Sequence, residues 1–253
     1  MIKMKTLILQ DIKSIIKNKP IISYLLIYPP LLIIVIGSVC KTIFSGVVMS
    51  SFDYYGVTMV VFLTMGTVIV LPELMFGSHV KKANSRIVFS PISRVQVYSS
   101  KLLAALIITV PIFTGYILMF NYIGIVNFGG NHVLRIILLE VSLLIFSISF
   151  GGAFCVLIKD EDMSTKLLNL VVNIISAFSG IFFPSYILGK AFAKLSSYSP
   201  VSLVIKAFFS TIYDNQVTTL YFSILVLLLC SMTFIIVIHL KFDLTNIMGG
   251  KQS

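Results

Sequence analysis

Apolar residues form six long stretches along this 253-residue chain, and most charged residues lie between them. The stretches are Ile21–Val39, Val57–Phe76, Leu102–Ile125, Val133–Ile158, Leu167–Phe183 and Thr218–His239. A hydrocarbon core about 30 Å thick is crossed by roughly 20 helical residues rising about 1.5 Å each. Because backbone polar groups find no water in lipid, each stretch is predicted to be a transmembrane helix. The fold class predicted is therefore all-α integral membrane. The alternating segments of about ten residues that would indicate a β-barrel are not seen.

The N-terminal segment, residues 1–20, shows a shorter helical pattern. Lysines occupy its other faces, and the apolar positions at helical spacing are Met4, Ile8, Ile12, Ile15 and Ile16. This pattern predicts an amphipathic helix on the inner membrane surface, ended by Pro20. It is an interfacial anchor, or a cuff that also touches a cytoplasmic partner. Residues 21–253 then form a single six-helix domain, and Pro29-Pro30 is expected to kink its first helix.

Two connections are longer than simple loops. The basic segment 77–101 is divided by Ser90-Pro91, which predicts a short helix with Ser90 as N-cap and Pro91 in its first turn. We therefore expect two short helices there, along or below the membrane. Residues 185–216 contain two apolar helices, Tyr186–Leu195 and Pro200–Tyr213, that are too short to span. This pair predicts a re-entrant or interfacial hairpin on the outer side.

Composition and charge agree with a membrane protein. Hydrophobic residues make up 58% of the chain and charged residues only 11%, which excludes an ordinary soluble domain. With the N-terminus inside, 14 of the 19 lysines and arginines lie on the cytoplasmic side. The positive-inside rule then places both termini in the cytoplasm. The outer basic residues are Lys41, Arg135, Lys190, Lys194 and Lys206. Nucleic-acid binding is a weak alternative, because the sequence shows no long basic stripe with interleaved aromatics.

The abundance of Lys, Ile, Asn and Ser is typical of an AT-rich bacterial genome, so the bacterial cell membrane is the expected location. No phosphate-binding G-x-x-x-x-G-K-[ST] segment occurs, nor H-E-x-x-H or G-x-S-x-G. The three cysteines and three histidines show no metal-ligand spacing. We therefore expect no catalytic residue, no metal and no cofactor in this chain. Glu140 is expected about 10 Å below the outer surface. Its role is structural, paired with Arg135 or Lys41, or it faces the cargo.

Six spans, a basic inner loop after the second and a hairpin before the sixth resemble the permease subunit of type 2 ATP-binding-cassette exporters. The likeness covers nearly the whole chain, and two segments carry its most specific part. The first is S-P-I-S-R at residues 90–94, followed by a lysine ten residues after the proline. In such permeases this segment seats in the ATPase subunit. The implied coupling residues are Ser90, Pro91, Ile92, Ser93, Arg94 and Lys101. The acidic and glycine positions that often precede the motif are occupied here by Val80, Lys82 and Ser85, so this loop is more basic than the family pattern.

The second segment is S-G-I-F-F-P at residues 179–184, followed by Y-S-P-V at residues 198–201. It is similar to the outer hairpin of the same family, with Ser199 where asparagine is usual. Together with the buried acid of the fourth stretch, these residues form a candidate pathway and outer gate. The candidates are Glu140, Phe182, Phe183, Pro184, Ser199 and Pro200.

The resemblance implies an ATP-driven exporter. Two copies of the permease, or one copy and a homologue, would enclose the pathway. Two separate ATPase subunits would bind ATP and Mg²⁺ below, and membrane lipids would surround the chain. The expected cargo is amphipathic or hydrophobic, such as a drug or a toxic peptide. The alternatives are a lipid-linked glycan exporter and a carrier or scaffold that works without an ATPase.

Overall fold

The computed structural model describes residues 2–44, 49–89, 92–182 and 199–243, and these residues are helical with no strand among them. Four helical segments in this part of the chain are long and apolar enough to cross a membrane. They are Ser51–Phe76 (α4, Ser51–Gly66; η2, Thr67–Ile69; α5, Val70–Phe76), α7 (Arg94–Ile123), α8 (Val133–Ile158) and α12 (Thr218–Lys241). The chain is therefore an all-helical membrane protein.

A fifth span is formed if two consecutive helices count as one. α2 (Lys19–Leu26) and α3 (Tyr28–Val39, followed by the 3-10 turn Cys40–Phe44) meet at an angle of 42°. Pro29 and Pro30 lie in the first turn of α3, where a proline removes no intrahelical donor. The predicted kink of the first span is thus confirmed, with the break at Ile27.

The fifth predicted stretch is a helix, α9 (Glu161–Phe178), but its predicted end is wrong. The helix stops at Phe178 rather than Phe183, because Gly180 takes the left-handed conformation (φ 79°) two residues later. Glycine at this position commonly ends a helix. The first two turns of α9 are charged, with Glu161, Asp162 and Lys166, so α9 is not among the four apolar spans.

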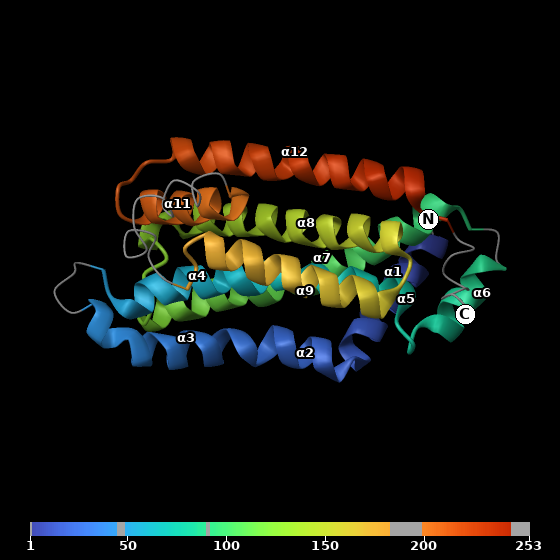
Figure 1. Cartoon of the computed structure of the whole chain (residues 1–253), viewed down its shortest axis with the longest axis horizontal. Helices are drawn as coiled ribbons and strands as arrows, with labels where there is room; N and C mark the ends of the chain where they lie inside the picture. Colours follow the sequence, from blue (N-terminus) through green and yellow to red (C-terminus); the bar gives the residue numbers. More distant parts are fainter. Residues whose placement is uncertain (1, 45–48, 90–91, 183–198, 244–253) are drawn as a thin grey trace.

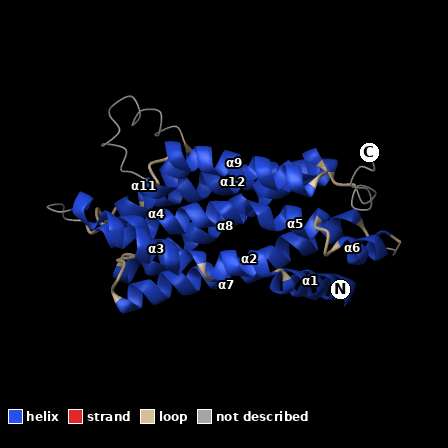
Figure 2. Ribbon diagram, turned by 60° about the horizontal axis from the view of Figure 1, so that its bottom comes forward, coloured by secondary structure: helices blue, strands red, loops and turns tan. Residues whose placement is uncertain are grey.

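The helices run between two ends of an elongated bundle (Figures 1 and 2). One end carries α1 (Ile2–Lys17) and α6 (Lys81–Val88), and we call it the α1 end. The other carries α11 (Pro200–Ile212) and is called the α11 end. At the α1 end the Tyr98 hydroxyl contacts His239 Nδ1 at 2.9 Å, joining the start of α7 to the end of α12.

The middle of the bundle is formed by α4–α5 and α8. Their apolar windows are 78% and 67% buried, against 28% for α7 and 22% for α12. A Cβ on Gly151 would lie 2.0 Å from the Val68 carbonyl oxygen, so only glycine lets α8 cross the η2 break this closely. The outward faces of α7 and α12 remain apolar, with exposed leucines and isoleucines, as expected of surfaces in contact with lipid.

Three predicted elements of the two long connections are tested. The first short helix of segment 77–101 is found as α6, but the second is not a separate helix. α7 starts at Arg94, where Ser93 and Gln96 cap each other's backbone N–H groups at 3.3 Å. This capping box is a stronger helix start than Ser90-Pro91, which lies outside the described residues. The predicted helix Pro200–Tyr213 is found as α11; Tyr186–Leu195 lies outside the described residues.

Candidate functional site

The most connected polar cluster lies at the α1 end, around Lys101 of α7. This lysine is fully buried, and its Nζ donates to Asp11 Oδ1 of α1 at 2.9 Å and to Asn84 Oδ1 of α6 at 3.0 Å. The Ser100 hydroxyl donates to the other oxygen of Asp11 at 2.9 Å. A buried charge is stable only when it is paired and hydrogen-bonded, and this pair meets both conditions.

Asn84 extends the cluster to a fourth helix. Its Nδ2 donates to the carbonyl oxygens of Leu74 and Met75, at 3.1 and 2.9 Å, in the last turn of α5. These carbonyls belong to a helix end, where no intrahelical donor is available. One continuous set of hydrogen bonds therefore joins α1, α5, α6 and α7. We call the set formed by Asp11, Asn84, Ser100 and Lys101 the buried clamp.

The structure divides the predicted coupling residues. Lys101 belongs to the buried clamp, whereas Ser93 and Arg94 are exposed at the start of α7 and Ile92 is half-buried against the core. Ser90 and Pro91 lie outside the described residues. The clamp fixes the helices on both sides of this segment, α6 before it and α7 after it. Lys101 is thus a positioning residue, and Arg94 is available at the surface.

Sequence reasoning missed Asp11 and Asn84. The buried face of α1 is centred on Leu7, Asp11 and Ile15, which are 5%, 3% and 1% exposed, and differs from the apolar face that the sequence predicted. A lone acid at the centre of an apolar stripe indicates a buried partner. That signal is present in the sequence, because Asp11 lies four residues from an apolar residue on each side.

A second polar cluster at the α1 end surrounds Glu73 in the last turns of α5. Its Oε1 accepts from Asn18 Nδ2 and pairs with His79 Nδ1, both at 2.9 Å. Glu161, at the start of α9, shares a hydrogen bond with Glu73. This bond, partial burial, and the nearby acids Asp160 and Asp162 raise the pKa of Glu161 to about 8. Glu73 thus links the α1–α2 junction, the α5–α6 turn and α9.

Glu140 of α8 is fully buried, but the predicted partners are wrong. One oxygen accepts from the Thr64 hydroxyl of α4, and the other has no hydrogen-bond partner among the described residues. Arg135 lies 3.1 Å from His132 Nδ1 instead, and Lys41 lies over the Phe52 ring, 5.4 Å from its centroid. Both basic residues sit near the α11 end, away from the Thr64 site where α4 approaches its break. A cargo-facing role for Glu140 stays a prediction.

The α11 end brings several predicted gate residues together. Ser199 Oγ lies 2.6 Å from Ser179 Oγ, and Pro200 begins α11 directly after it. The Phe182 ring meets Phe62 of α4 edge-on at 5.3 Å, and its carbonyl oxygen accepts from the Tyr55 hydroxyl at 3.1 Å. Phe183 and Pro184 lie outside the described residues.

Two tyrosines of α4 were missed at this end. The Tyr54 hydroxyl donates to the Gly180 carbonyl oxygen, and its ring stacks on Phe209 of α11 at 5.6 Å. Tyr55 holds the Phe182 carbonyl as described above. Adjacent tyrosines at the start of a span are a usual interfacial pattern, so the sequence alone does not single them out.

α9 carries an exposed polar stripe. Asp162, Lys166, Asn169 and Asn173 are exposed at spacings of four, three and four residues, which places them on one helical face. The opposite face, with Leu168 and Val172, is buried against the bundle. Asparagine side chains directed at lipid would leave their amides unsatisfied, so this face suits contact with water or with another protein surface. No three His, Cys, Asp or Glu side chains of the described chain are grouped as metal ligands.

The apolar spans, the kinked first pair and the polar ends define a helical integral membrane protein. Its family follows from comparison with known proteins: the sequence model of the ABC-2 type transporter family matches residues 3–213. This match covers most of the 253 residues, and the chain belongs to that family. A search of curated proteins gave no match. Membership makes the chain a transmembrane permease, a class that generally works with an ABC ATPase.

Proposed function

We propose that this chain is the permease subunit of an ATP-driven exporter, with six spans and both termini in the cytoplasm. α2–α3, α4–α5, α7, α8, α9 and α12 are the six spans, in the cell membrane of a bacterium. Two separate ATPase subunits bind at the α1 end, and the energy of ATP hydrolysis enters there. The 14-to-5 distribution of basic residues supports the orientation, since the α1 end carries the lysine-rich helix α1.

The observation that carries the proposal is the buried clamp beside the predicted coupling segment. A segment that transmits force must be fixed to the parts it moves. Asp11, Asn84 and Lys101 join the helices flanking residues 90–94 to α1 and α5. ATPase closure would then move α1, α6 and α7 as one unit. Arg94, exposed at the start of α7, is the contact residue, because a guanidinium can pair with a carboxylate through two hydrogen bonds.

The pathway is proposed along the polar stripe of α9, at the interface with a second permease copy or a homologue. Asn169 and Asn173 would face water there instead of lipid. At the α11 end, α11 is proposed to lie over the exit of the pathway. The proposed cargo is an amphipathic or hydrophobic molecule, such as a drug or a toxic peptide.

The decisive experiment is co-purification of the tagged chain with a candidate ATPase subunit, followed by measurement of cargo-stimulated ATP hydrolysis in vesicles. Arg94→Glu should abolish most of the stimulation while the protein still inserts, because it reverses the charge at the contact. Arg135→Glu is the matched control: it reverses an exposed arginine at the α11 end and should leave stimulation intact. Failure of the wild-type chain to bind any ATPase would favour a carrier or scaffold instead. Unchanged stimulation in Arg94→Glu would remove Arg94 from the contact.

A further inference from the structure

α1 uses a second face that the buried clamp does not occupy. Leu7, Asp11 and Ile15 point toward α7, whereas Gln10, Lys13, Ser14 and Lys17 lie on a neighbouring face at spacings of three, one and three residues. This second face lines a hollow of about 590 Å³ at the α1 end. It is therefore turned toward an open volume and not toward another helix.

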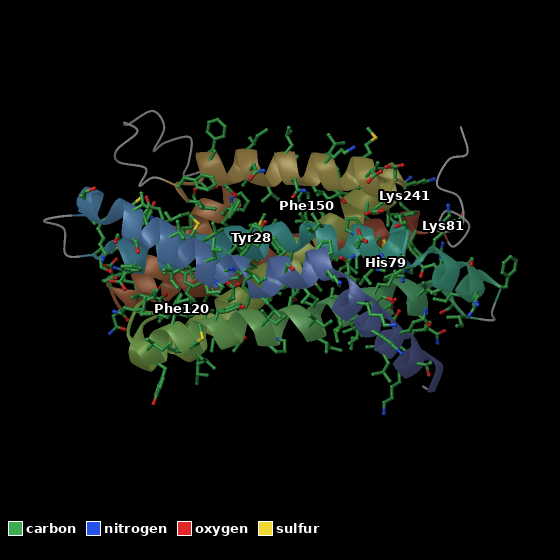
Figure 3. All side chains as sticks on the ribbon, turned by 90° about the horizontal axis from the view of Figure 1, so that it is seen from below. Tyr28, His79, Lys81, Phe120, Phe150 and Lys241 are labelled. Carbon is green, nitrogen blue, oxygen red and sulfur yellow. The ribbon has the colours of Figure 1, made fainter. Side chains whose placement is uncertain are left out.

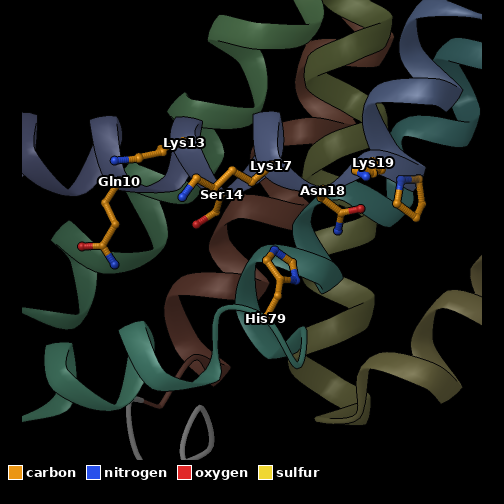
Figure 4. A pocket seen from close by; sticks show the side chains of 8 residues that line it. Gln10, Lys13, Ser14, Lys17, Asn18, Lys19 and His79 are labelled. Atoms are coloured by element: carbon orange, nitrogen blue, oxygen red, sulfur yellow. The ribbon is translucent and has the colours of Figure 1, made fainter.

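The hollow is basic. Beyond the α1 residues, its lining consists of Asn18, Lys19 and Pro20 from the α1–α2 junction and of His79 from the α5–α6 turn. Figure 4 shows the α1 side chains along one wall and His79 rising from the opposite wall. Three lysines face this space and no acid lines it. The charge of the lining therefore suits an anion.

An apolar hollow continues from the basic one. It has a volume of about 480 Å³ and shares Asn18 and Pro20 with its neighbour. Apolar and aromatic side chains form most of its walls, and Ser23, Glu73 and Thr165 also line it; the former are Ile21, Tyr24 and Tyr28 of the kinked first span and Ile69 of η2. Figure 3 labels Tyr28, which lines this hollow, and His79, which lines the basic one. The basic hollow and the apolar hollow together match a molecule with an anionic head and a hydrocarbon chain.

One carboxylate, Glu73, lies at the junction and could repel such a head. Its Oε1 already accepts from Asn18 and pairs with His79, and Glu161 shares a hydrogen bond with the same carboxyl group. The negative charge is thus engaged on the protein side. The lysines of the mouth have no such partner in the described ion pairs, which are His79–Glu73 and Lys101–Asp11.

We propose that these two hollows form a binding site for an anionic phospholipid. The phosphate lies between Lys13, Lys17 and Lys19, and one acyl chain runs along Tyr24, Tyr28 and Ile69. Long lysine side chains reach from an interfacial helix to headgroups in this way. The lipid would fill the space between α1 and the α5–α6 turn, and so hold α1 against the bundle through the face next to the buried clamp. The site does not depend on the cargo or on an ATPase.

The test uses the full chain in detergent micelles, with bound lipid measured by native mass spectrometry and by displacement of fluorescent phosphatidylglycerol. The double variant Lys13→Gln/Lys17→Gln should weaken phosphatidylglycerol binding by about 25-fold, at about fivefold for each lysine. Lys5→Gln/Lys159→Gln, which removes two exposed lysines outside the hollow, is the matched control and should leave binding unchanged. Phosphatidylcholine should bind the wild type weakly and should not respond to either pair.

Further measurements distinguish a bound lipid from inorganic phosphate and from a protein contact. Ile69→Trp fills the apolar hollow, so it should weaken phosphatidylglycerol binding, whereas inorganic phosphate at the lipid's concentration should displace no lipid from the wild type. Displacement of the lipid by inorganic phosphate at equal concentration would show a free-phosphate site and overturn the proposal. Equal phosphatidylglycerol affinity in wild type and Lys13→Gln/Lys17→Gln would also overturn it. The proposal also fails if Lys13→Gln/Lys17→Gln keeps its phosphatidylglycerol affinity but no longer co-purifies with an ATPase subunit. The hollow would then belong to a protein contact.

Discussion

The two ends of the bundle are held together by different chemistry. At the α1 end, buried ionic and amide groups join four helices, with Lys101 and Asp11 at the centre. At the α11 end the contacts are aromatic rings and hydroxyl groups, such as Tyr54 on Phe209 and Ser179 with Ser199. Separating a buried charge pair leaves each charge buried without a partner, which costs several kcal/mol, so the helices that carry the pair keep their relative position. Stacked rings and hydroxyls can re-pack at small cost. Under the proposed function, the α1 end moves as a unit and the α11 end is the one that opens.

The largest effect is expected from breaking the buried clamp. Asp11→Ala leaves Lys101 buried without a counter-ion, which should lower the free energy of unfolding by about 3–5 kcal/mol. Thermal unfolding of the purified protein in detergent measures this loss. The double variant Asp11→Leu/Lys101→Met removes both charges and should recover most of it. If Asp11→Ala unfolds at the wild-type temperature, the clamp does not hold the α1 end together.

The sequence did not predict the clamp: the family resemblance implied Lys101 as a coupling residue, and its partners in the clamp are distant along the chain. Lys101 stood out through its spacing from Pro91, but Asp11 is ninety residues away and Asn84 seventeen. Hydropathy predicts where helices lie and which faces are apolar, not which two polar residues meet across them. The start of α7 could have been predicted, because Ser93 and Gln96 form a capping pattern that is visible in the sequence. The prediction placed the helix start at Ser90-Pro91 instead.

At the α11 end, too, local signals could be predicted from the sequence and contacts between distant residues could not. The helix starting at Pro200 follows from a local signal, and so does the stop at Gly180, which the predicted span overran. The contacts of Tyr54 and Tyr55 with the segment after α9 join residues more than a hundred positions apart. The partners predicted for Glu140, Arg135 and Lys41, are wrong because nearness along the chain or at the membrane edge does not decide which side chains meet. The real partner of Glu140, Thr64, is uncharged and on another helix.

A smaller effect is expected at the α11 end. Tyr54→Phe keeps the ring stacked on Phe209 and removes the hydrogen bond to the Gly180 carbonyl, so the loss of stability should be about 1 kcal/mol. If this end is the one that opens, the variant should also raise labelling of a cysteine placed at Ser202 by a water-soluble thiol reagent. Tyr221→Phe, on the exposed face of α12, is the control. A loss as large as that of Asp11→Ala would contradict the difference between the two ends.

The smallest effect is a pH dependence at the α1 end, centred on Glu161. Its pKa is raised to about 8 because its carboxyl group shares a hydrogen bond with Glu73 and is partly buried beside Asp160 and Asp162. The folded state therefore holds this proton more tightly than the unfolded state, so the contribution to stability is complete at acidic pH and is lost as the pH rises toward about 8. The midpoint of thermal unfolding should therefore fall as the pH rises from about 4.5 to about 8, and should change little from this group above pH 8. Glu161→Gln keeps a hydrogen-bond donor toward Glu73 and should flatten that fall, whereas His79, which pairs with the same carboxylate, stays in place in both proteins. An equal fall in wild type and Glu161→Gln would assign the pH dependence to another group.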